Sequence, residues 1–193
     1  MAVSLFFINV IRFNLRRICF SFTAFLIFNE TFAQEKKSPN FFGINPSITV
    51  EPYYKKGELD VNVLPFVWQK PLFLRMDLRL SSILNLGVRE TGNVISHYGL
   101  EFAGVVFIKR KTEITECPSA WFVAPVVSLT QNQYEDKSNV GLWLEPGYAF
   151  LFENKFALSL GLQFGMTAFI SHQEELSWGN HFGFKVIFGK WFP

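Results

Sequence analysis

The stretch Phe156-Ala-Leu-Ser-Leu-Gly-Leu-Gln-Phe-Gly-Met-Thr-Ala-Phe-Ile170 decides the fold class of this chain. Every even position in it is apolar, and every odd position except Phe169 is small or polar. A period of two is typical of a β-strand whose two faces differ in chemistry. Ordinary strands have roughly 5–6 residues, whereas a tilted strand that crosses a membrane needs roughly 9–11. Because the polar face lacks the Lys and Glu of a solvated surface, the stretch predicts one strand of a transmembrane β-barrel.

The first 33 residues differ from the rest of the chain and match a secretory signal peptide. Three arginines precede an apolar run over residues 18–28, and small residues lead up to Ala33. We expect cleavage after Ala33, because Thr31 and Ala33 stand at positions −3 and −1. The apolar run is shorter than the roughly 20 residues of a membrane helix, which argues against an uncleaved membrane anchor. Residues 34–40 are then a short periplasmic lead, and residues 41–193 form the barrel.

Charge and cysteine content narrow the classes of function. Removing residues 1–33 takes three Arg and one Glu from 18 Lys+Arg and 16 Asp+Glu, so the mature chain carries 15 charges of each sign. A net charge of zero predicts no nucleic-acid partner. Only Cys117 of the two cysteines remains after cleavage, which leaves no intramolecular disulfide. The three His lie in different segments, so we expect no metal and no cofactor.

Eight segments of the mature chain alternate in the same way as the opening stretch. They cover residues 42–53, 59–68, 72–86, 94–108, 120–130, 139–152, 156–170 and 181–192. Short connections such as Gln69-Lys-Pro71 and residues 153–155 are expected turns. With both termini in the periplasm, turns on that side and longer loops outside are the outer-membrane pattern. Tyr and Trp near strand ends match the aromatic girdles of such proteins. The prediction is an all-β, eight-stranded, antiparallel, up-and-down transmembrane β-barrel.

The last predicted strand ends in alternating aromatic residues, Phe184-Lys-Val-Ile-Phe-Gly-Lys-Trp-Phe192, followed by Pro193. This end resembles the C-terminal assembly signal of the small eight-stranded outer-membrane β-barrel proteins of Gram-negative bacteria, with Phe188, Trp191 and Phe192 as its aromatic residues. Trp143-Leu-Glu-Pro-Gly-Tyr148 and Leu160-Gly-Leu-Gln-Phe-Gly165 resemble an uncharacterised barrel family of Bacteroidetes. The resemblance implies a bacterial outer-membrane location, contact with outer-membrane lipid, and recognition by the barrel-assembly machinery. We expect a monomer.

Strand parity places a set of charged residues inside the barrel, namely Glu51, Asp60, Arg75, Asp77, Arg79, Glu101, Glu145 and Lys185. The polar residues Asn62, His97, Gln163 and His181 point the same way. An eight-stranded barrel has an interior just wide enough for side chains to fill, and buried charges need partners. We therefore expect a lumenal network in which Arg75 and Arg79 pair with acidic residues among Glu51, Asp77, Glu101 and Glu145.

A catalytic site of the kind found in barrel enzymes that modify lipid A would need a Ser beside a His oriented by a carboxylate. Ser96, His97 and Glu101 supply these residue types. Adjacent strand residues point to opposite faces, so parity predicts that Ser96 and His97 do not meet. Ser171 and His172 fail for the same reason. We therefore expect a protein that is not an enzyme.

The predicted function is a non-enzymatic outer-membrane barrel with a side-chain-filled polar lumen and a structural or surface-interaction role. Outward loops 131–137 and 171–178 each join acidic residues to one aromatic and would carry any specificity for a surface partner. Two alternatives stay open. One is a narrow pore for small solutes. The other is a secreted lipocalin-like barrel, apolar inside and polar outside, that binds a small apolar ligand.

Overall fold

The computed structural model describes residues 38–193 except 50–58, 91, 114, 134–136 and 172–175. These residues belong to one compact unit, Ser38–Pro193, in which every described regular element is a β-strand. The predicted signal peptide, most of the predicted lead and Glu51 lie outside the described residues. No described helix is long and apolar enough to cross a membrane.

Ten strands follow one another along the chain. They are β1 (Asn40–Ile44), β2 (Ile48–Thr49), β3 (Leu59–Asn62), β4 (Phe66–Phe73), β5 (Met76–Val88), β6 (Val94–Phe107), β7 (Ala120–Asn132), β8 (Lys137–Leu151), β9 (Phe156–Ser171) and β10 (Ser177–Phe192).

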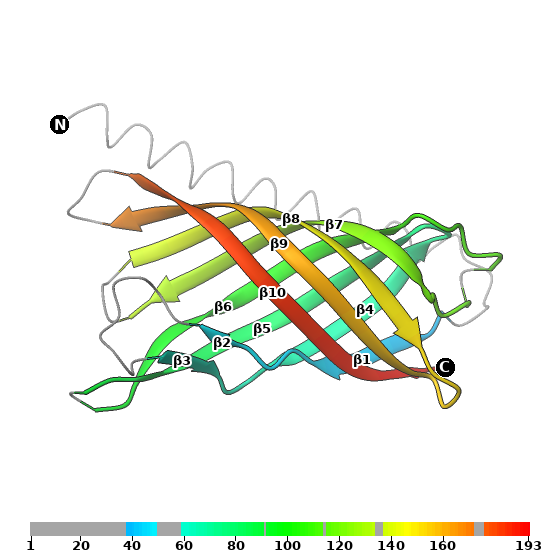
Figure 1. The fold of residues 1–193 in the computed structure, drawn as a ribbon, viewed down its shortest axis with the longest axis horizontal. Helices are drawn as coiled ribbons and strands as arrows, with labels where there is room; N and C mark the ends of the chain where they lie inside the picture. The colour runs from blue at the N-terminus through cyan, green and yellow to red at the C-terminus, as the bar shows by residue number, and fades with distance from the viewer. Residues whose placement is uncertain (1–37, 50–58, 91, 114, 134–136, 172–175) are drawn as a thin grey trace, which may run out of the picture. The chain divides into compact units, whose positions relative to one another are not determined.

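Eight of the strands form a closed antiparallel ring. Each strand from β4 to β10 pairs with the next, and β1 lies between β10 and β4. Figure 1 shows the long strands β7 to β10 side by side, with β10 crossing in front between β9 and β1. The all-β class and the antiparallel pairing of the prediction are confirmed. β9 pairs with β8 on one side and β10 on the other. Paired strands share their two faces, so the alternating pattern of β9 alone indicated the two-faced character of the sheet.

The first two predicted strands are each broken into two pieces. β1 and β2 replace the single strand expected at 42–53, and Pro46 lies in the gap. β3 and β4 replace the strand expected at 59–68, and Pro65 lies between them. Both pieces pair with the same edge of β5, β4 at residues 76–81 and β3 at residues 85–88. Proline removes a ladder donor, so the interruptions occur where proline stands.

The first turn is also displaced from its predicted place. Gln69-Lys-Pro71 was expected to turn the chain but lies within β4, and the turn is formed by residues 74–75. A register shift in the β4–β5 pairing falls between Pro71 and Phe73. Such a bulge is one of the positions where a strand accepts proline. The prediction of a turn at Pro71 is therefore wrong. The displaced turn contains Arg75, which was expected inside a strand.

The ring has two ends that differ in their connections. The turn end carries residues 74–75, 108–119 and 152–155. Among the described residues, the loop end carries 89–90, 92–93, 133 and 176. β7 continues to Asn132 and β10 starts at Ser177, so the connections at the loop end are shorter than predicted.

The outer face of the ring is apolar. Large exposed hydrophobic side chains project from it on β1, β4 and each strand from β6 to β10; examples are Phe42, Phe66, Leu100, Phe102, Val127, Leu129, Leu142, Leu144, Leu162, Phe164, Met166, Phe182 and Phe184. Among the described outward positions of β5 to β10, Lys190 is the one charged residue, and it lies near the turn end. Trp121 and Tyr148 pack edge to face on this surface, with ring centroids 5.1 Å apart.

Candidate functional site

The half of the ring interior nearest the turn end is filled by apolar side chains. One buried cluster contains Ala103, Val105, Phe107, Ala120, Phe122, Ala124, Val126 and Ala149. A second contains Phe41, Val67, Ala157, Ile187 and Trp191. Phe107 and Phe122 meet edge to face at 6.2 Å between ring centroids. This half is a packed core.

A layer of buried charges lies next to the apolar core. We call Arg79, Glu101, Glu145 and Lys185 the charge belt. Arg79 Nη2 donates to Glu145 Oε1 at 2.7 Å. Lys185 Nζ donates to Glu101 Oε1 and lies 3.9 Å from Glu145 Oε2. Gln163 Nε2 donates to Glu145 Oε2 at 2.9 Å. Arg79 on β5 and Glu145 on β8 are not neighbours in the ring, so their ion pair crosses the interior.

Two further buried carboxylates lie on either side of the charge belt. Asp77, near the turn end, accepts from Lys111 Nζ and from Gln69 Nε2, the latter at 2.8 Å. Asp60, near the loop end, accepts from Arg89 Nη2 at 2.6 Å. Each buried carboxylate therefore has a cation beside it, as burial of a charge requires.

Six of the predicted lumenal residues are buried in the ring interior: Asp60, Asp77, Arg79, Glu101, Glu145 and Lys185. Arg75 is not among them. It lies in the displaced turn at residues 74–75 and is exposed, so the prediction that it faces inward is wrong. Lys111, not Arg75, is the cation beside Asp77.

Sequence reasoning missed Lys111 and Arg89 as partners of the buried carboxylates. Both residues lie in connections between strands, where alternation assigns no direction to a side chain. Lys111 N donates to Leu74 O at 2.9 Å, and this bond holds the connection 108–119 against the turn. No periodic signal in the sequence could have identified either residue.

The expectation that Ser96 and His97 point to opposite faces is also wrong. The β5–β6 register shifts between Asn85, which pairs with His97, and Leu86, which pairs with Ile95. Ser96 is the extra residue of this bulge. Its Oγ donates to Asp60 Oδ2 at 2.8 Å, and His97 Nδ1 lies 3.3 Å from the same oxygen. Ser96 is thus bonded to the carboxylate and not to the imidazole, which is not the order of a nucleophile, base and orienting acid.

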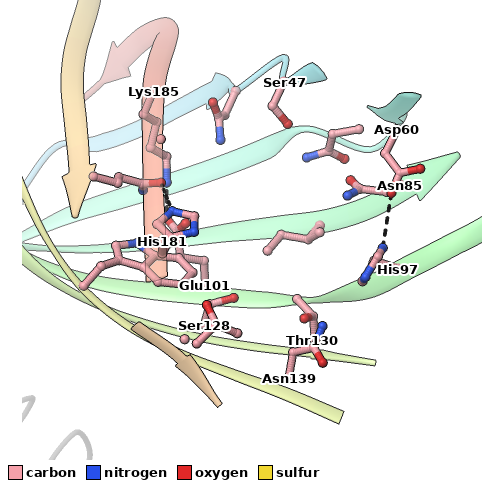
Figure 2. A pocket seen from close by; sticks show the side chains of 18 of the residues that line it. Ser47, Asp60, Asn85, His97, Glu101, Ser128, Thr130, Asn139, His181 and Lys185 are labelled. Carbon is pink, nitrogen blue, oxygen red and sulfur yellow. Dashed lines mark hydrogen bonds and ion pairs between the residues drawn. The ribbon is translucent and has the colours of Figure 1, made fainter. Parts of the chain in front are cut away.

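A polar cavity of ≈ 790 Å³ occupies the interior between the charge belt and the loop end. Its lining includes the inward amide and hydroxyl side chains of Asn45, Ser47, Asn62, Asn85, Ser128, Thr130, Asn132, Asn139, Gln163 and Thr167. Figure 2 shows Lys185 and His181 on one side of the cavity and Asp60 with His97 on the other.

An aromatic pair forms part of the cavity wall. Trp143 and His181 stack with ring centroids 4.0 Å apart and an interplanar angle of 14°. Gly165 on β9 pairs with Trp143 on β8 and with His181 on β10. A Cβ at Gly165 would lie 2.6 Å from Trp143 Cβ, so glycine is needed between the two rings. His181 Nε2 also lies 3.2 Å from Gln163 Oε1.

The predicted assembly-signal residues lie on the strand that closes the ring. Phe188 and Phe192 project from the outer face of β10, whereas Trp191 is buried against Phe41, with ring centroids 5.4 Å apart. All three positions pair with β1.

Cys117 lies in the connection 108–119 and is half buried against the second apolar cluster. Burial raises the pKa of its thiol, and the nearby Lys155 and Lys111 act in the opposite direction. The described residues contain no group of three or more His, Cys, Asp or Glu placed to hold a metal ion.

Comparisons of the chain with family models, with curated proteins and with solved structures found no match. Function is therefore inferred from the geometry of the ring and its interior.

Proposed function

We propose that this chain is an integral outer-membrane β-barrel that is not an enzyme, has a closed lumen, and presents its loop end to the exterior. The observation that carries the proposal is the distribution of polarity. Hydrophobic side chains cover the outside of the closed ring, and charged side chains are buried inside it. Soluble monomeric proteins rarely expose a contiguous apolar surface of this extent. A protein surface in contact with lipid is apolar.

Strand length and ring closure also support a membrane location. β5 to β10 have 13 to 16 residues each, which exceeds the roughly 9–11 that a tilted strand needs to cross the hydrocarbon. Closure leaves no unpaired strand edge in lipid, which is a condition for any β-structure that spans a bilayer. Lys190 lies where the strands approach the turn end, at a depth where a cation costs little.

The same distribution of polarity favours this proposal over a secreted lipocalin-like barrel. A barrel of that kind needs an apolar cavity and a polar outer face. Here the cavity is lined by amides, hydroxyls and charges, while Phe182 and Phe184 are largely exposed on the outside. A small apolar ligand in this cavity would take water from buried amides and charges without offering them a hydrogen bond.

A closed lumen is supported by two layers that lie in series. The charge belt crosses the interior through the Arg79–Glu145 ion pair, and the apolar clusters fill the interior beyond it. An ion moving along the axis would have to break buried ion pairs and then enter an apolar core. Both steps are unfavourable.

The proposed absence of catalysis is supported by the bonding around Asp60. Its carboxylate accepts from Ser96 Oγ and Arg89 Nη2. Ser96 therefore donates directly to the carboxylate, and His97 Nδ1 has no hydrogen-bond partner among the described residues. The residues of the C-terminal strand, Phe188, Trp191 and Phe192, are proposed as the signal for the assembly machinery.

The test combines fractionation with conductance. The protein should be recovered from the outer-membrane fraction of its native cells, and refolded mature protein should give no stable open conductance in planar bilayers. A large porin refolded in the same way is the control for insertion. Recovery in the soluble periplasm would contradict the membrane proposal, and stable conductance would favour the narrow-pore alternative.

A further inference from the structure

The polar cavity carries an inference that goes beyond the proposed function. Its charged groups are already paired with one another. Lys185 is bonded to Glu101, and Asp60 is bonded to Arg89 and close to His97. A charged ligand would have to displace one of these buried partners, at a cost that a neutral ligand avoids. The electrostatics of the cavity therefore favour a neutral ligand.

The hydrogen-bonding capacity of the cavity lies in its amides and hydroxyls. Each carboxamide offers two donors and an acceptor, and each hydroxyl offers a donor and acceptors. Such a lining matches a ligand that carries many hydroxyl groups, since each hydroxyl can donate to one wall and accept from another.

Two buried polar atoms on β8 have no hydrogen-bond partner among the described residues. They are Asn139 Oδ1, an acceptor, and Trp143 Nε1, a donor. Both residues line the cavity. They are four positions apart on one face of the strand, or roughly 13 Å. Buried polar atoms are normally satisfied, so a ligand hydroxyl that reaches these two atoms after a small side-chain rotation would supply the partners that they lack.

The stacked pair of Trp143 and His181 supplies a flat aromatic surface in the cavity wall. Glycines at three positions make room for it. A Cβ at Gly141 would lie 1.8 Å from the Trp143 ring, one at Gly165 would meet the Trp143 backbone at 2.6 Å, and one at Gly183 would lie 3.2 Å from His181 Nε2. Sugars have a flat face of C–H groups that packs on such a ring while their hydroxyls bond to the surrounding amides.

We propose that the polar cavity binds a neutral polyhydroxylated small molecule, of the size of a mono- or disaccharide. The volume of ≈ 790 Å³ falls in the range of roughly 300–1,000 Å³ that is usual for small-molecule sites. The charge belt forms the floor of the site, and the ligand stops there because the lumen is closed below it.

The experiment is calorimetric titration of the refolded mature protein with glucose, maltose and N,N′-diacetylchitobiose. A non-glycosidic detergent is essential, because the head group of a maltoside detergent is itself a probe. Glucuronate and glucosamine test the charge argument, and cyclohexanol tests an apolar ligand. At least one neutral sugar should bind saturably and more tightly than its charged analogues.

Two pairs of variants locate the site. Asn139→Ala and Trp143→Phe each remove one unpartnered atom and should weaken binding about tenfold. Asn154→Ala, in the turn at residues 152–155, and Trp121→Phe, on the outer face, make the same chemical changes outside the cavity and should leave affinity unchanged. The change in tryptophan fluorescence on binding should disappear in Trp143→Phe and persist in Trp121→Phe.

Absence of saturable binding by all neutral sugars would overturn the inference, as would tighter binding of glucuronate or cyclohexanol. Equal loss of affinity in the control variants would also overturn it. The outcome is separable from that of the proposed function. A soluble protein that binds maltose would refute only the membrane proposal, whereas a membrane-inserted protein that binds no sugar would refute only this inference.

Discussion

The two halves of the ring interior share the same strands but differ in what their inward positions contain. Along β7 these positions read Ala120, Phe122, Ala124 and Val126 near the turn end, and then Ser128, Thr130 and Asn132 near the loop end. The first group is packed into a buried cluster, and the second lines a cavity. The change occurs at the level of the charge belt. The ring therefore has a packed core at one end of its axis and a polar cavity at the other.

A phenylalanine in each half provides the sharpest test of this difference. Phe122 is buried in the turn-end cluster, whereas Phe169 borders the polar cavity. Phe122→Ala should lower the free energy of unfolding by about 3–5 kcal/mol, because it empties a packed core. Phe169→Ala should cost less than half as much, since a cavity is already there. Urea unfolding of the refolded protein in vesicles measures both. Equal losses would show that the two halves do not differ in packing.

The charge belt should be the next most sensitive element. Arg79→Leu leaves the Glu145 carboxylate buried without its closest cation, and should cost about 3 kcal/mol without preventing insertion. The double variant Arg79→Leu/Glu145→Leu should lose less than the sum of the two single variants, because the pair is removed together. Unfolding midpoints in urea give the three values. An unchanged melting of Arg79→Leu would refute the pairing.

The long strands and the inward charges could be predicted from the sequence because alternation determines them residue by residue. β9 and the inward direction of Arg79, Glu145 and Lys185 follow from a period of two. Proline indicated the breaks at Pro46 and Pro65, because it removes a ladder donor. The alignment of the resulting strand pieces along β5 depends on strand pairing, which the alternation does not specify. The displaced turn that puts Arg75 outside depends on a bulge, which alternation does not detect.

The candidate site was less predictable than the fold, because it depends on contacts between distant segments. Ser96 joins Asp60 only because the register shifts by one residue. Lys111 reaches Asp77 from a connection without periodicity. The sequence indicated only one member of the stacked pair over Gly165. A large inward aromatic, Trp143, lies two residues from Gly141, but its partner His181 is two strands away in the ring.

Gly165 offers a smaller effect that tests the cavity wall. Gly165→Ala should cost about 2 kcal/mol, because the new Cβ would lie 2.2 Å from Leu142 O and strand β8 must shift. Gly104→Ala is the matched control, since its Cβ would meet the flexible end of Met76 at 3.0 Å and otherwise only Pro125 Cγ, at an ordinary contact distance of 3.9 Å. This control should be neutral or slightly stabilising. Thermal unfolding of both variants measures the difference, and a neutral Gly165→Ala would contradict the tight packing of the stacked pair.

The last prediction compares how accessible the two halves are to a reagent from solution. Cys117 is the one cysteine of residues 34–193, and it packs against the second apolar cluster at the turn end. Burial raises the pKa of its thiol, so less of the reactive thiolate is present near neutral pH than in an exposed cysteine. Its alkylation by N-ethylmaleimide should therefore be slower than that of a cysteine peptide, and should keep rising with pH after the peptide has levelled off. A cysteine introduced in the cavity, Thr130→Cys in a Cys117→Ser background, should react several times faster. Mass spectrometry over time measures both rates. Equal rates at the two positions would mean that the turn end is as open as the cavity, and the separation of the two halves would fail.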